Sequence, residues 1–554
     1  MRTKLTISIV AIALGSLSYF LLPKGEQQKP AYSPRTDMNE QQGWQGAAEA
    51  IAKIRNNPTT GTVSFEEWNE AYEAVKAMRG QRGTLGMEWE QIGPANVGGR
   101  TRAILVDAND PTGNTVFAGG VTGGLWKSTD GAGTWSPVGD LMPNLVISCI
   151  AQGPDGTIYA GTGCGYDGYA NAPALFWPGK GIYKSTDGNT FSLISSTIPP
   201  DNDLGDTWSS VQRIAVDPNN ANRICAATHS GLRISDDGGS TWTNPVFVDY
   251  PNCNIQSNGL GGDVVILDNG TIIAIVGGTG YRSTSGSSCT FERLTTYGLP
   301  VAGRTVLAKA PSDNSVVWAI EANSGSADLK GLYKSTDHGA NWTKVLGKIT
   351  NYFEPLCSSS NCQGIYDLAL GVSPNDPNSV IIGGVELWRW DGNLTRIAWE
   401  FGYYPYYVHA DKHIIYFDPT DQTGKTMYIG CDGGVFKSLD GANTFFEANR
   451  NYITTQFYAM AFFSAKYNVA QNGLYNYGWP FGGTQDNGTI LVPMQVIPAS
   501  GVNTDQDGLG ILGGDGFDCD ASQISSAMFA TIYNGCLYRA NAAEGANLSF
   551  ADIG

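Results

Sequence analysis

The chain has 554 residues, of which 71 are glycine, and 11% of its residues are aromatic. Only 15% are charged, against about 25% in an ordinary soluble domain, and the formal net charge is −17. This composition favours many short strands joined by tight turns, and it argues against a helical bundle or a disordered chain. Because phosphate binding needs patches of lysine and arginine, the charge also argues against nucleic acid and anionic membrane surfaces as partners.

The N-terminus has the form of an export signal. Arg2 and Lys4 precede an apolar run from Leu5 to Leu22, and Pro23 ends it. A basic segment followed by an apolar one predicts a signal peptide over 1–22. The run is about 18 residues long, so an uncleaved signal anchor is the alternative. We therefore expect the rest of the chain to be secreted or to lie at the cell surface.

A short helical segment is expected before the main domain. Residues 23–37 are polar and contain proline, which predicts a linker. Residues 38–86 predict a helical hairpin or pro-like segment, with helices over 38–56 and 64–79. Ser64 and Glu67 form a capping box in front of the apolar positions of the second helix.

Internal repetition dominates from residue 89 onward. A turn of sequence Ser-x-Asp-x-Gly-x-Thr-Trp, here called the box, recurs about every 50 residues and is most complete at 235–242. The box at 283–291 has lost its aspartate, and 387–392 and 535–539 mark further units without a full box. The aspartates of the five boxes are Asp130, Asp187, Asp237, Asp337 and Asp440.

The length of one repeat predicts the fold class. Each unit contains four strand-like segments in about 50 residues, which is the size of a propeller blade. We therefore expect an all-β, multi-bladed β-propeller of four-stranded antiparallel blades over 87–554, with about 8–10 blades. Residues 89–92 are a candidate closing strand. No terminal domain is recognisable after the last repeat, so we expect the propeller to be truncated at its C-terminus.

The box has a structural interpretation. Its aspartate can accept backbone N–H bonds across the turn, its glycine supplies a positive φ, and its tryptophan can pack between neighbouring sheets. We therefore expect these aspartates to stabilise the fold rather than to catalyse a reaction.

The ten cysteines show no zinc-finger spacing. In an exported chain some should pair, and hairpin or neighbouring-strand geometry favours Cys357 with Cys362 and Cys519 with Cys536. Buried free thiols are the alternative for either pair.

The boxes resemble those of the Asp-box (bacterial neuraminidase repeat) propellers, specifically the sortilin/VPS10-like group exported by Bacteroidota. Four further segments carry the resemblance, which covers about 38–554. They are 92–100, 409–413, 456–458 and 482–489. The resemblance implies a β-propeller fold and export. Members of this group often carry a C-terminal sorting domain for type IX secretion, which is not recognisable here. Because one fold hosts many activities, the boxes indicate fold better than function.

Two glycosidase families also resemble the chain in their blades. Sialidases carry an Arg-Ile-Pro segment, which does not occur here. Xyloglucanase-type endoglucanases carry a catalytic aspartate in the first blade, and Val121 stands at that place. Asp432 and Asp515 follow glycine-rich strand ends and are weak catalytic candidates, with turn capping as the alternative. An inverting pair of carboxylates would lie about 6.5–9.5 Å apart.

The segment His409-Ala410-Asp411-Lys412-His413 holds two of the four histidines. On a strand His409, Asp411 and His413 would share one face, where they could line the central channel. His409 and His413 are also weak metal candidates, although alternate strand residues lie about 7 Å apart, which is wide for one ion. The ligand residues expected at the same channel are Tyr406, Gln485 and Asp486.

Two other features suggest ligands. The aromatic segments 403–407 and 475–481 could stack on sugar rings or on peptide, with core packing as the alternative. The turn 505–508 could hold a structural Ca²⁺, with a plain solvated turn as the alternative. No cofactor is firmly implied.

Together these features predict an extracellular recognition or structural propeller that binds protein or glycan without clear catalytic machinery. The alternative is a glycoside hydrolase that acts on polysaccharide with a carboxylate pair. Membrane attachment is expected only through an uncleaved signal or a missing sorting domain.

Overall fold

The computed structural model describes residues 91–553 with internal gaps, and isolated positions between 59 and 77. The gaps are 141, 167–176, 201–204, 250–251, 257–260, 300–302, 350–353, 359–360, 401–403, 465–477, 493–505, 523–526, 533–534 and 542–549. The chain divides into two compact units, Met1–Val63 and Ser64–Gly554. The expected signal, linker and first helix lie outside the described residues. Within the second expected helix, the described positions from Glu67 to Ala77 are helical. No helix in the described part is long and apolar enough to cross a membrane.

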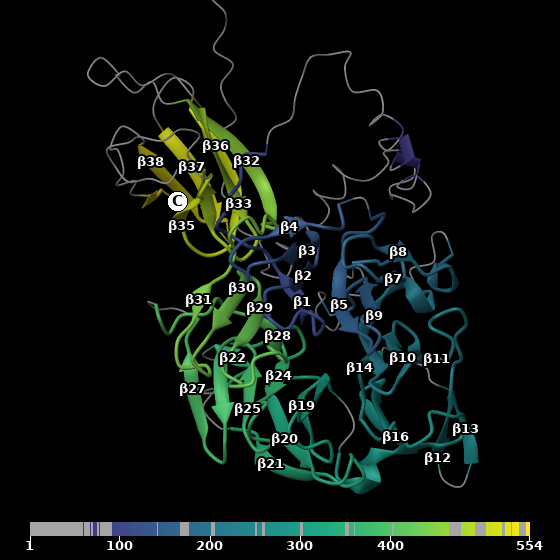
Figure 1. Ribbon diagram of the computed structural model, residues 1–554. Coiled ribbons are helices and arrows are strands. Elements are labelled where there is room, and N and C mark those ends of the chain that lie inside the picture. The colour runs from purple at the N-terminus through teal and green to yellow at the C-terminus, as the bar shows by residue number, and fades with distance from the viewer. Residues whose placement is uncertain are drawn as a thin grey trace, which may run out of the picture. The chain divides into compact units, whose positions relative to one another are not determined.

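Of the ten sheets in the described residues, seven follow one another along the chain as blades (Figure 1). Blade 1 contains β1 (Thr101–Val106), β2 (Val116–Gly120), β3 (Gly124–Ser128) and β4 (Ser136–Pro137). Blade 2 contains β5 (Ile147–Gln152), β6 (Ile158–Thr162), β7 (Ile182–Ser185) and β8 (Ser192–Leu193). Blade 3 contains β9 (Val211–Asp217), β10 (Asn220–Thr228) and β11 (Gly231–Ser235). Blade 4 contains β14 (Gly261–Ile266), β15 (Ile272–Val276), β16 (Thr279–Ser283) and β17 (Phe291–Arg293).

The remaining blades repeat this antiparallel order. Blade 5 contains β18 (Thr305–Lys309), β19 (Val317–Ala322), β20 (Leu329–Ser335) and β21 (Thr343–Gly347). Blade 6 contains β24 (Ala369–Val372), β25 (Val380–Gly383), β26 (Leu387–Trp390) and β27 (Leu394–Ala398). Blade 7 contains β28 (Lys412–Phe417), β29 (Met427–Cys431), β30 (Gly434–Ser438) and β31 (Phe446–Glu447).

Small elements decorate these blades. The hairpin β12 (Val246–Asp249) and β13 (Asn252–Gln256) extends blade 4 by parallel pairing with β17. A second hairpin, β22 (Cys357–Ser358) and β23 (Asn361–Cys362), precedes blade 6. The 3₁₀ helices are η4 (Ser195–Thr197), η5 (Thr207–Ser209) and η6 (Leu294–Tyr297).

The seven blades close on themselves. Their first strands, β1, β5, β9, β14, β18, β24 and β28, each contact the next, and β28 contacts β1. Every residue of β1 and of β15 is buried, because each blade packs against a neighbour on both faces. One apolar cluster joins blade 1 to blade 7 through Ile104, Trp135, Tyr428 and Tyr452.

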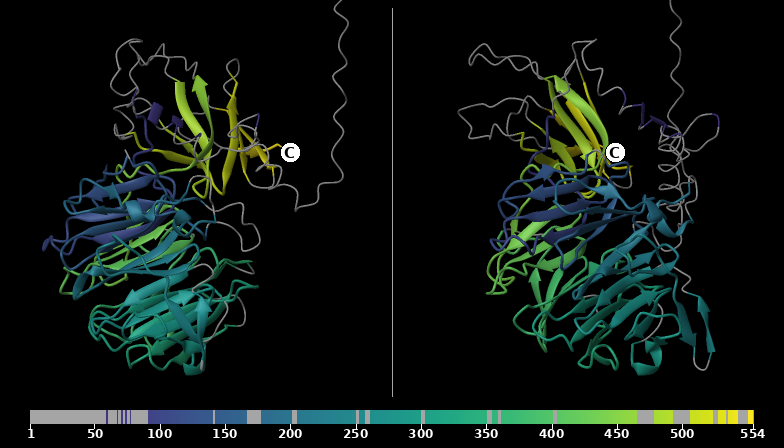
Figure 2. Two further views of the ribbon diagram at one scale, coloured as in Figure 1. Left: turned by 90° about the vertical axis from the view of Figure 1, so that its right-hand side faces the viewer. Right: turned by 45° about the vertical axis from the view of Figure 1, so that its right-hand side comes forward.

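Two further sheets follow the ring (Figures 1 and 2). They contain β32 (Phe457–Ser464), β33 (Gly478–Thr484), β34 (Thr489–Leu491) and β35 (Leu509–Leu512), then β36 (Gly516–Ala521), β37 (Ala527–Ile532), β38 (Leu537–Asn541) and β39 (Ala551–Asp552). β36 lies against β32 and β33. Asn96 joins this part to the ring by donating to Gly508 O and accepting from Gly508 N.

These contacts sharpen the expected blade arrangement. The nine predicted units are present among the described residues, but seven close as one ring and the other two lie outside it. The candidate closing strand is wrong in its described half, because Gln91 and Ile92 form no strand. Blade 1 takes all four of its strands from one continuous segment, so closure needs no strand from elsewhere.

The boxes stabilise their own turns, and the box of blade 1 also contacts a neighbouring blade. In the box of blade 1, Asp130 accepts from Thr134 N at 2.8 Å, and the equivalent bonds exist in the other four boxes. Gly131 has the positive φ that the turn requires, 69°. The Trp135 indole donates to Ala448 O at 2.7 Å and packs on Tyr452, so this box fastens blade 1 to blade 7.

Of the two expected disulfides one is present. Cys357 and Cys362 are bonded, and Cys289 is also disulfide-bonded. The pairing of Cys519 with Cys536 is wrong, because both are free. Cys519 lies on β36 opposite Ala530 of β37, and Ala530 in turn faces β38, which Cys536 precedes. Two strand spacings amount to roughly 10 Å, beyond the reach of a disulfide.

Candidate functional site

A cluster of charged side chains lies where loops of blades 1, 6 and 7 meet the turn between β33 and β34. Arg100 precedes β1, Tyr366 precedes β24, and His413 is the second residue of β28. Asp432 directly follows β29, at the tight turn into β30, and Asp486 lies in the β33–β34 turn. Segments more than 380 residues apart thus contribute to one site, which we call the Asp432 cluster.

Asp432 is the centre of this cluster and is fully enclosed. Its carboxylate accepts from Arg100 Nε at 3.0 Å, from His413 Nε2 at 2.6 Å and from the Tyr366 hydroxyl at 2.6 Å. Its side chain has 0% exposure. Burial by itself would raise the pKa of Asp432, but the charge of Arg100 and the contact with His413 hold that pKa well below its ordinary value. Asp432 is therefore a permanent, fully partnered anion.

His413 is neutral at physiological pH. Burial, together with the positive charge of Arg102, lowers the pKa of His413 to about 4. A neutral ring that contacts a carboxylate through Nε2 carries its proton on Nε2, so His413 donates to Asp432. Its Nδ1 is buried and has no hydrogen-bond partner among the described residues.

Asp486 shares Arg100 with Asp432. Its Oδ2 lies 3.0 Å from Arg100 Nη2, and its side chain keeps 23% exposure. Its N–H donates to Asp515 Oδ1 at 2.7 Å, and its carbonyl lies 3.1 Å from His409 Nε2. Burial and the charge of Asp432 raise the pKa of Asp486 well above its ordinary value, despite Arg100. Asp486 is therefore a half-buried carboxyl group that holds its proton.

Asp411 is a second carboxyl group with a raised pKa. Burial, then the charge of Asp432, raises the pKa of Asp411 to about 7. The Gln363 amide donates to its Oδ1 at 3.1 Å. Asp367, in blade 6, is completely buried, and neither of its oxygens has a hydrogen-bond partner in the described part. Burial, then the charge of Asp411, raises the pKa of Asp367 well above its ordinary value. Around Asp432, whose own pKa is lowered, the pKa values of three carboxyl groups are thus raised.

The expected strand over 409–413 is wrong. β28 begins at Lys412, and Asp411 has a φ of 62°, which breaks the extended alternation. His409 therefore reaches Asp486, whereas His413 turns to Asp432. The two histidines have separate partners, so the shared face that suggested a metal site does not form.

Only one trio of side chains in the described part brings its potential metal-binding atoms within 4.8 Å of one another. It consists of Glu354, Cys357 and Cys362, and its two cysteines are joined as a disulfide. In the turn proposed for Ca²⁺, Asp505 lies outside the described residues and Asp507 pairs with Arg450. A carboxylate that is paired with a guanidinium group is less available as a ligand for Ca²⁺.

The other predicted ligand residues divide between the cluster and the ring exterior. Gln485 lies beside Asp486, where its N–H donates to Gln456 O at 2.9 Å. Tyr406 does not reach the channel, because it packs on Trp399 next to the outermost strand of blade 6 and is 51% exposed. Of the aromatic segments, 403 and 475–477 lie outside the described residues. Val121 is fully buried.

The weak catalytic candidates converge, but not as a free pair. Asp432 is enclosed, and one oxygen of Asp515 accepts the Asp486 N–H. Sequence reasoning missed Arg100 and Tyr366, two of the three partners that enclose Asp432. Arg100 ends the segment 92–100 that carried part of the family resemblance, which was its one signal, whereas Tyr366 and Gln363 lie in no recognisable motif.

Comparison with known proteins identifies the fold. No family model and no curated protein matches the sequence. Among solved structures, an ancestral GH74 enzyme matches at 18% identity with a TM-score of 0.54, over 84% of this chain and 64% of its own. A GH74 xyloglucanase from Xanthomonas campestris matches at 14% identity with a TM-score of 0.50, over 83% of this chain and 75% of its own. The chain thus spans less than two thirds of the first of these proteins, and it has the β-propeller fold.

Proposed function

We propose that this protein is a secreted or cell-surface recognition propeller that binds a polysaccharide or protein ligand over the Asp432 cluster. The observation that supports this is the enclosure of Asp432. A general acid or base must come within hydrogen-bond distance of its substrate, whereas every face of this carboxylate is taken by Arg100, His413 and Tyr366. Asp432 therefore holds its neighbouring side chains in place and does not itself contact the ligand.

The groups above Asp432 suit recognition. Asp411, Asp486, His409 and Gln363 are half-buried and provide both donors and acceptors. A protonated carboxyl group can donate to a hydroxyl and accept from it, which suits the vicinal hydroxyls of a sugar. Because the neighbouring GH74 fold includes a xyloglucanase, xyloglucan is the first ligand to test.

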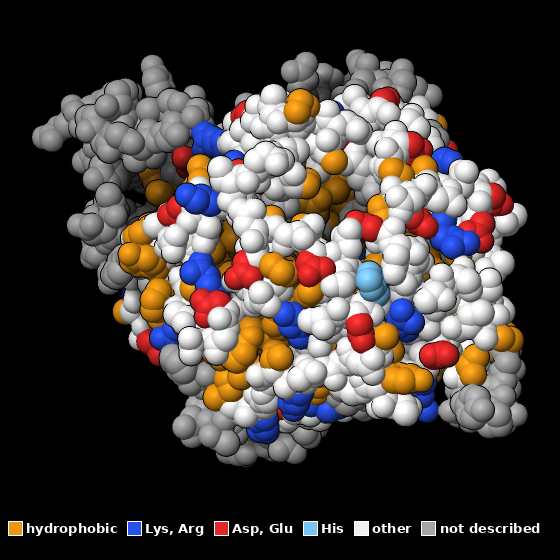
Figure 3. All heavy atoms as spheres, turned by 60° about the horizontal axis from the view of Figure 1, so that its bottom comes forward, with side chains coloured by type: hydrophobic (Ala, Val, Ile, Leu, Met, Phe, Trp, Pro, Cys, Tyr) orange, Lys and Arg blue, Asp and Glu red, His pale blue; other side chains and the backbone are white. Residues whose placement is uncertain are grey.

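The charge distribution does not oppose a neutral ligand. On the face in Figure 3, acidic and basic side chains alternate with hydrophobic ones, although the whole chain carries −17. Long-range electrostatic attraction therefore contributes little to the binding of a neutral glycan. The affinity would come from contacts with the Asp432 cluster.

The test is a binding assay with the full chain and a panel of plant, algal and host glycans. Asp486→Asn keeps the shape of the site but loses a carboxyl group, and it should weaken binding by about tenfold, as expected for one buried hydrogen bond to a ligand. Asp440→Asn, in the box of blade 7, is the matched control and should bind as the original chain does. No binding to any glycan or protein ligand, or equal binding by Asp486→Asn, would contradict the proposal.

A hydrolase is the second candidate, because carboxyl pKa values are driven apart at this site. Asp411 titrates at about 7 and Asp432 well below its ordinary value, which is the pattern of an acid beside an anion. Asp411 or Asp486 would then protonate the leaving group. Release of reducing ends from any glycan of the panel, abolished by Asp411→Asn or Asp486→Asn, would favour this reading over recognition alone.

The family and the location are part of the same proposal. The boxes support membership of the sortilin/VPS10-like Asp-box propellers exported by Bacteroidota, and the apolar run at 5–22 supports export. Fractionation of expressing cells tests this directly, because recovery of the chain in the cytoplasm with residues 1–22 intact would contradict export.

A further inference from the structure

The two cysteines of the disulfide in the β22–β23 hairpin differ in their exposure. Cys357 directly opposes Cys362 across the hairpin. Cys357 is 3% exposed, whereas Cys362 is half-buried. An external thiol therefore reaches the sulfur of Cys362 far more easily than the sulfur of Cys357.

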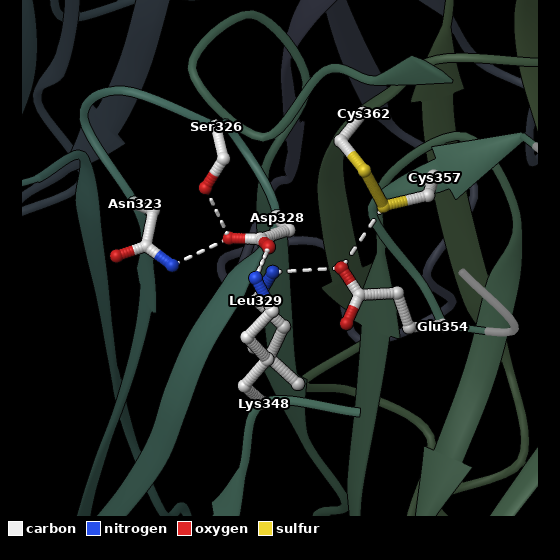
Figure 4. Close-up of a disulfide and its surroundings, with 8 residues drawn as sticks. All are labelled: Asn323, Ser326, Asp328, Leu329, Lys348, Glu354, Cys357 and Cys362. Carbon is white, nitrogen blue, oxygen red and sulfur yellow. Dashed lines mark hydrogen bonds and ion pairs between the residues drawn. A yellow bond between two sulfur atoms is a disulfide. The ribbon is translucent and has the colours of Figure 1, made fainter. Parts of the chain in front are cut away.

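A buried carboxyl group lies against the hidden sulfur. Glu354 is 1% exposed, and its Oε1 lies 3.0 Å from Cys357 Sγ (Figure 4). The Leu329 N–H donates to the same oxygen at 2.7 Å and fixes its place. Oε2 is buried and has no hydrogen-bond partner among the described residues. Since a disulfide sulfur carries no proton, only Glu354 can supply one to this contact.

The surroundings of Glu354 favour its protonated form. Burial, and then the neighbouring charge of Asp328, raises the pKa of Glu354, whereas the Leu329 N–H and Lys348 act in the opposite direction. Asp328 is itself held by Asn323, Ser326 and Lys348 (Figure 4). Because Lys348 pairs directly with Asp328, the ammonium group is already partly neutralised where it faces Glu354.

We propose that Cys357–Cys362 is a thiol–disulfide exchange site at which Glu354 gives its proton to the departing sulfur of Cys357. The partner is a dithiol, small or on another protein. Its thiolate attacks Cys362 Sγ and forms a mixed disulfide, while the Cys357–Cys362 bond breaks and its electron pair goes to Cys357 Sγ. The Glu354 proton moves to that sulfur and leaves a carboxylate. The second thiol of the partner then loses its proton to solvent and attacks the partner's own sulfur in the mixed disulfide. The bond to Cys362 Sγ breaks and Cys362 leaves as a thiolate, so the partner ends as a disulfide and the chain ends with two reduced cysteines.

Reduction of the folded full chain by dithiothreitol tests this proposal. Peptide mass analysis after alkylation would follow Cys357 and Cys362 separately from the six free cysteines. Glu354→Gln removes the proton donor and should slow reduction by about tenfold or more, the low end of general acid catalysis. Glu400→Gln is the matched control, because Glu400 accepts from Ser358 Oγ at 2.6 Å on the same hairpin rather than contacting a cysteine sulfur through this bond. Equal rates for the original chain and Glu354→Gln would overturn the proposal.

The unmutated chain gives a second test that does not depend on the folding of a variant. The reduction rate, divided by the concentration of dithiothreitol thiolate, should fall as pH rises through the pKa of Glu354, because the acid form is lost. A rate per thiolate that stays constant with pH would overturn the proposal. So would a disulfide that dithiothreitol reduces only after the chain has been unfolded in urea.

Discussion

Replacing Asp432 with asparagine removes the one negative charge that three buried groups share. Arg100 is 5% exposed, and its other carboxyl partner is Asp486, whose pKa is raised well above its ordinary value in the original chain. An asparagine amide offers one acceptor where the carboxylate offers two, and its NH₂ would face donors from Arg100, His413 or Tyr366. The variant therefore leaves a buried positive charge and at least one unsatisfied donor.

Breaking a buried ion pair in this way costs about 3–5 kcal/mol of unfolding free energy. Urea unfolding followed by tryptophan fluorescence measures the loss for the ring. Asp515→Asn is the control, because Asp515 is half-buried and accepts one backbone N–H, so it should cost no more than about 1 kcal/mol. If Asp432→Asn also cost less than about 1 kcal/mol, Asp432 would not be a buried anion and the argument for its role would fail.

The pH dependence of the same variant provides an independent check. The pKa of Asp432 is lower in the folded chain than in the unfolded chain. Its contribution to stability is therefore complete above the unfolded pKa of about 3.9, and is lost as pH falls through the folded pKa. The stability difference between the original chain and Asp432→Asn should be constant near neutral pH and shrink in acid. A difference that grows in acid would refute the reasoning.

Three other outcomes are expected. Trp135→Ala should cost about 3–5 kcal/mol of unfolding free energy, because it removes an indole that packs on Tyr452 at the closure of the ring; a urea midpoint unchanged from the original would contradict this. By proton NMR, one of the four histidines, His413, should titrate near pH 4, and no titration below about pH 5 would show that it is not buried beside Asp432. Asp411→Asn should be more stable than the original chain above pH 7 and not below pH 4, since the Asp411 pKa rises from 3.8 to about 7 on folding. The full shift would be worth about 4 kcal/mol, which solvent screening at this half-buried group reduces to about 1–2 kcal/mol; an equal gain at both pH values in thermal unfolding would contradict it.

The repeats made the fold predictable. A box needs only a local turn, so Ser235 to Trp242 indicates its structure by itself, and the recurrence of the box counts the units. The hairpin pair Cys357 and Cys362 was predictable for the same reason, because its two residues are close in sequence. The predicted pairing of Cys519 with Cys536 was wrong, because the two residues lie on opposite sides of a strand that their spacing in the sequence does not reveal.

The site was predictable only in part. His413, Asp432 and Asp486 stood out as unusual residues, and the structure brings them together. Their roles could not be predicted from the sequence, because the charge state of an aspartate depends on the groups that surround it in the folded chain. Arg100 and His413 lower the pKa of Asp432, whereas burial and the charge of Asp432 raise the pKa values of Asp486 and Asp411.

The sequence by itself determined the local elements of this protein: the box turns, the four-stranded units and their order along the chain. These depend on interactions within about 50 residues, which a repeat displays directly. Tertiary structure alone decided that seven units close and two lie beyond them, since closure is a contact between β1 and β28, at the two ends of the ring. It also decided the chemistry of the Asp432 cluster, because the charge state of each carboxyl group depends on burial and on charges supplied by distant segments.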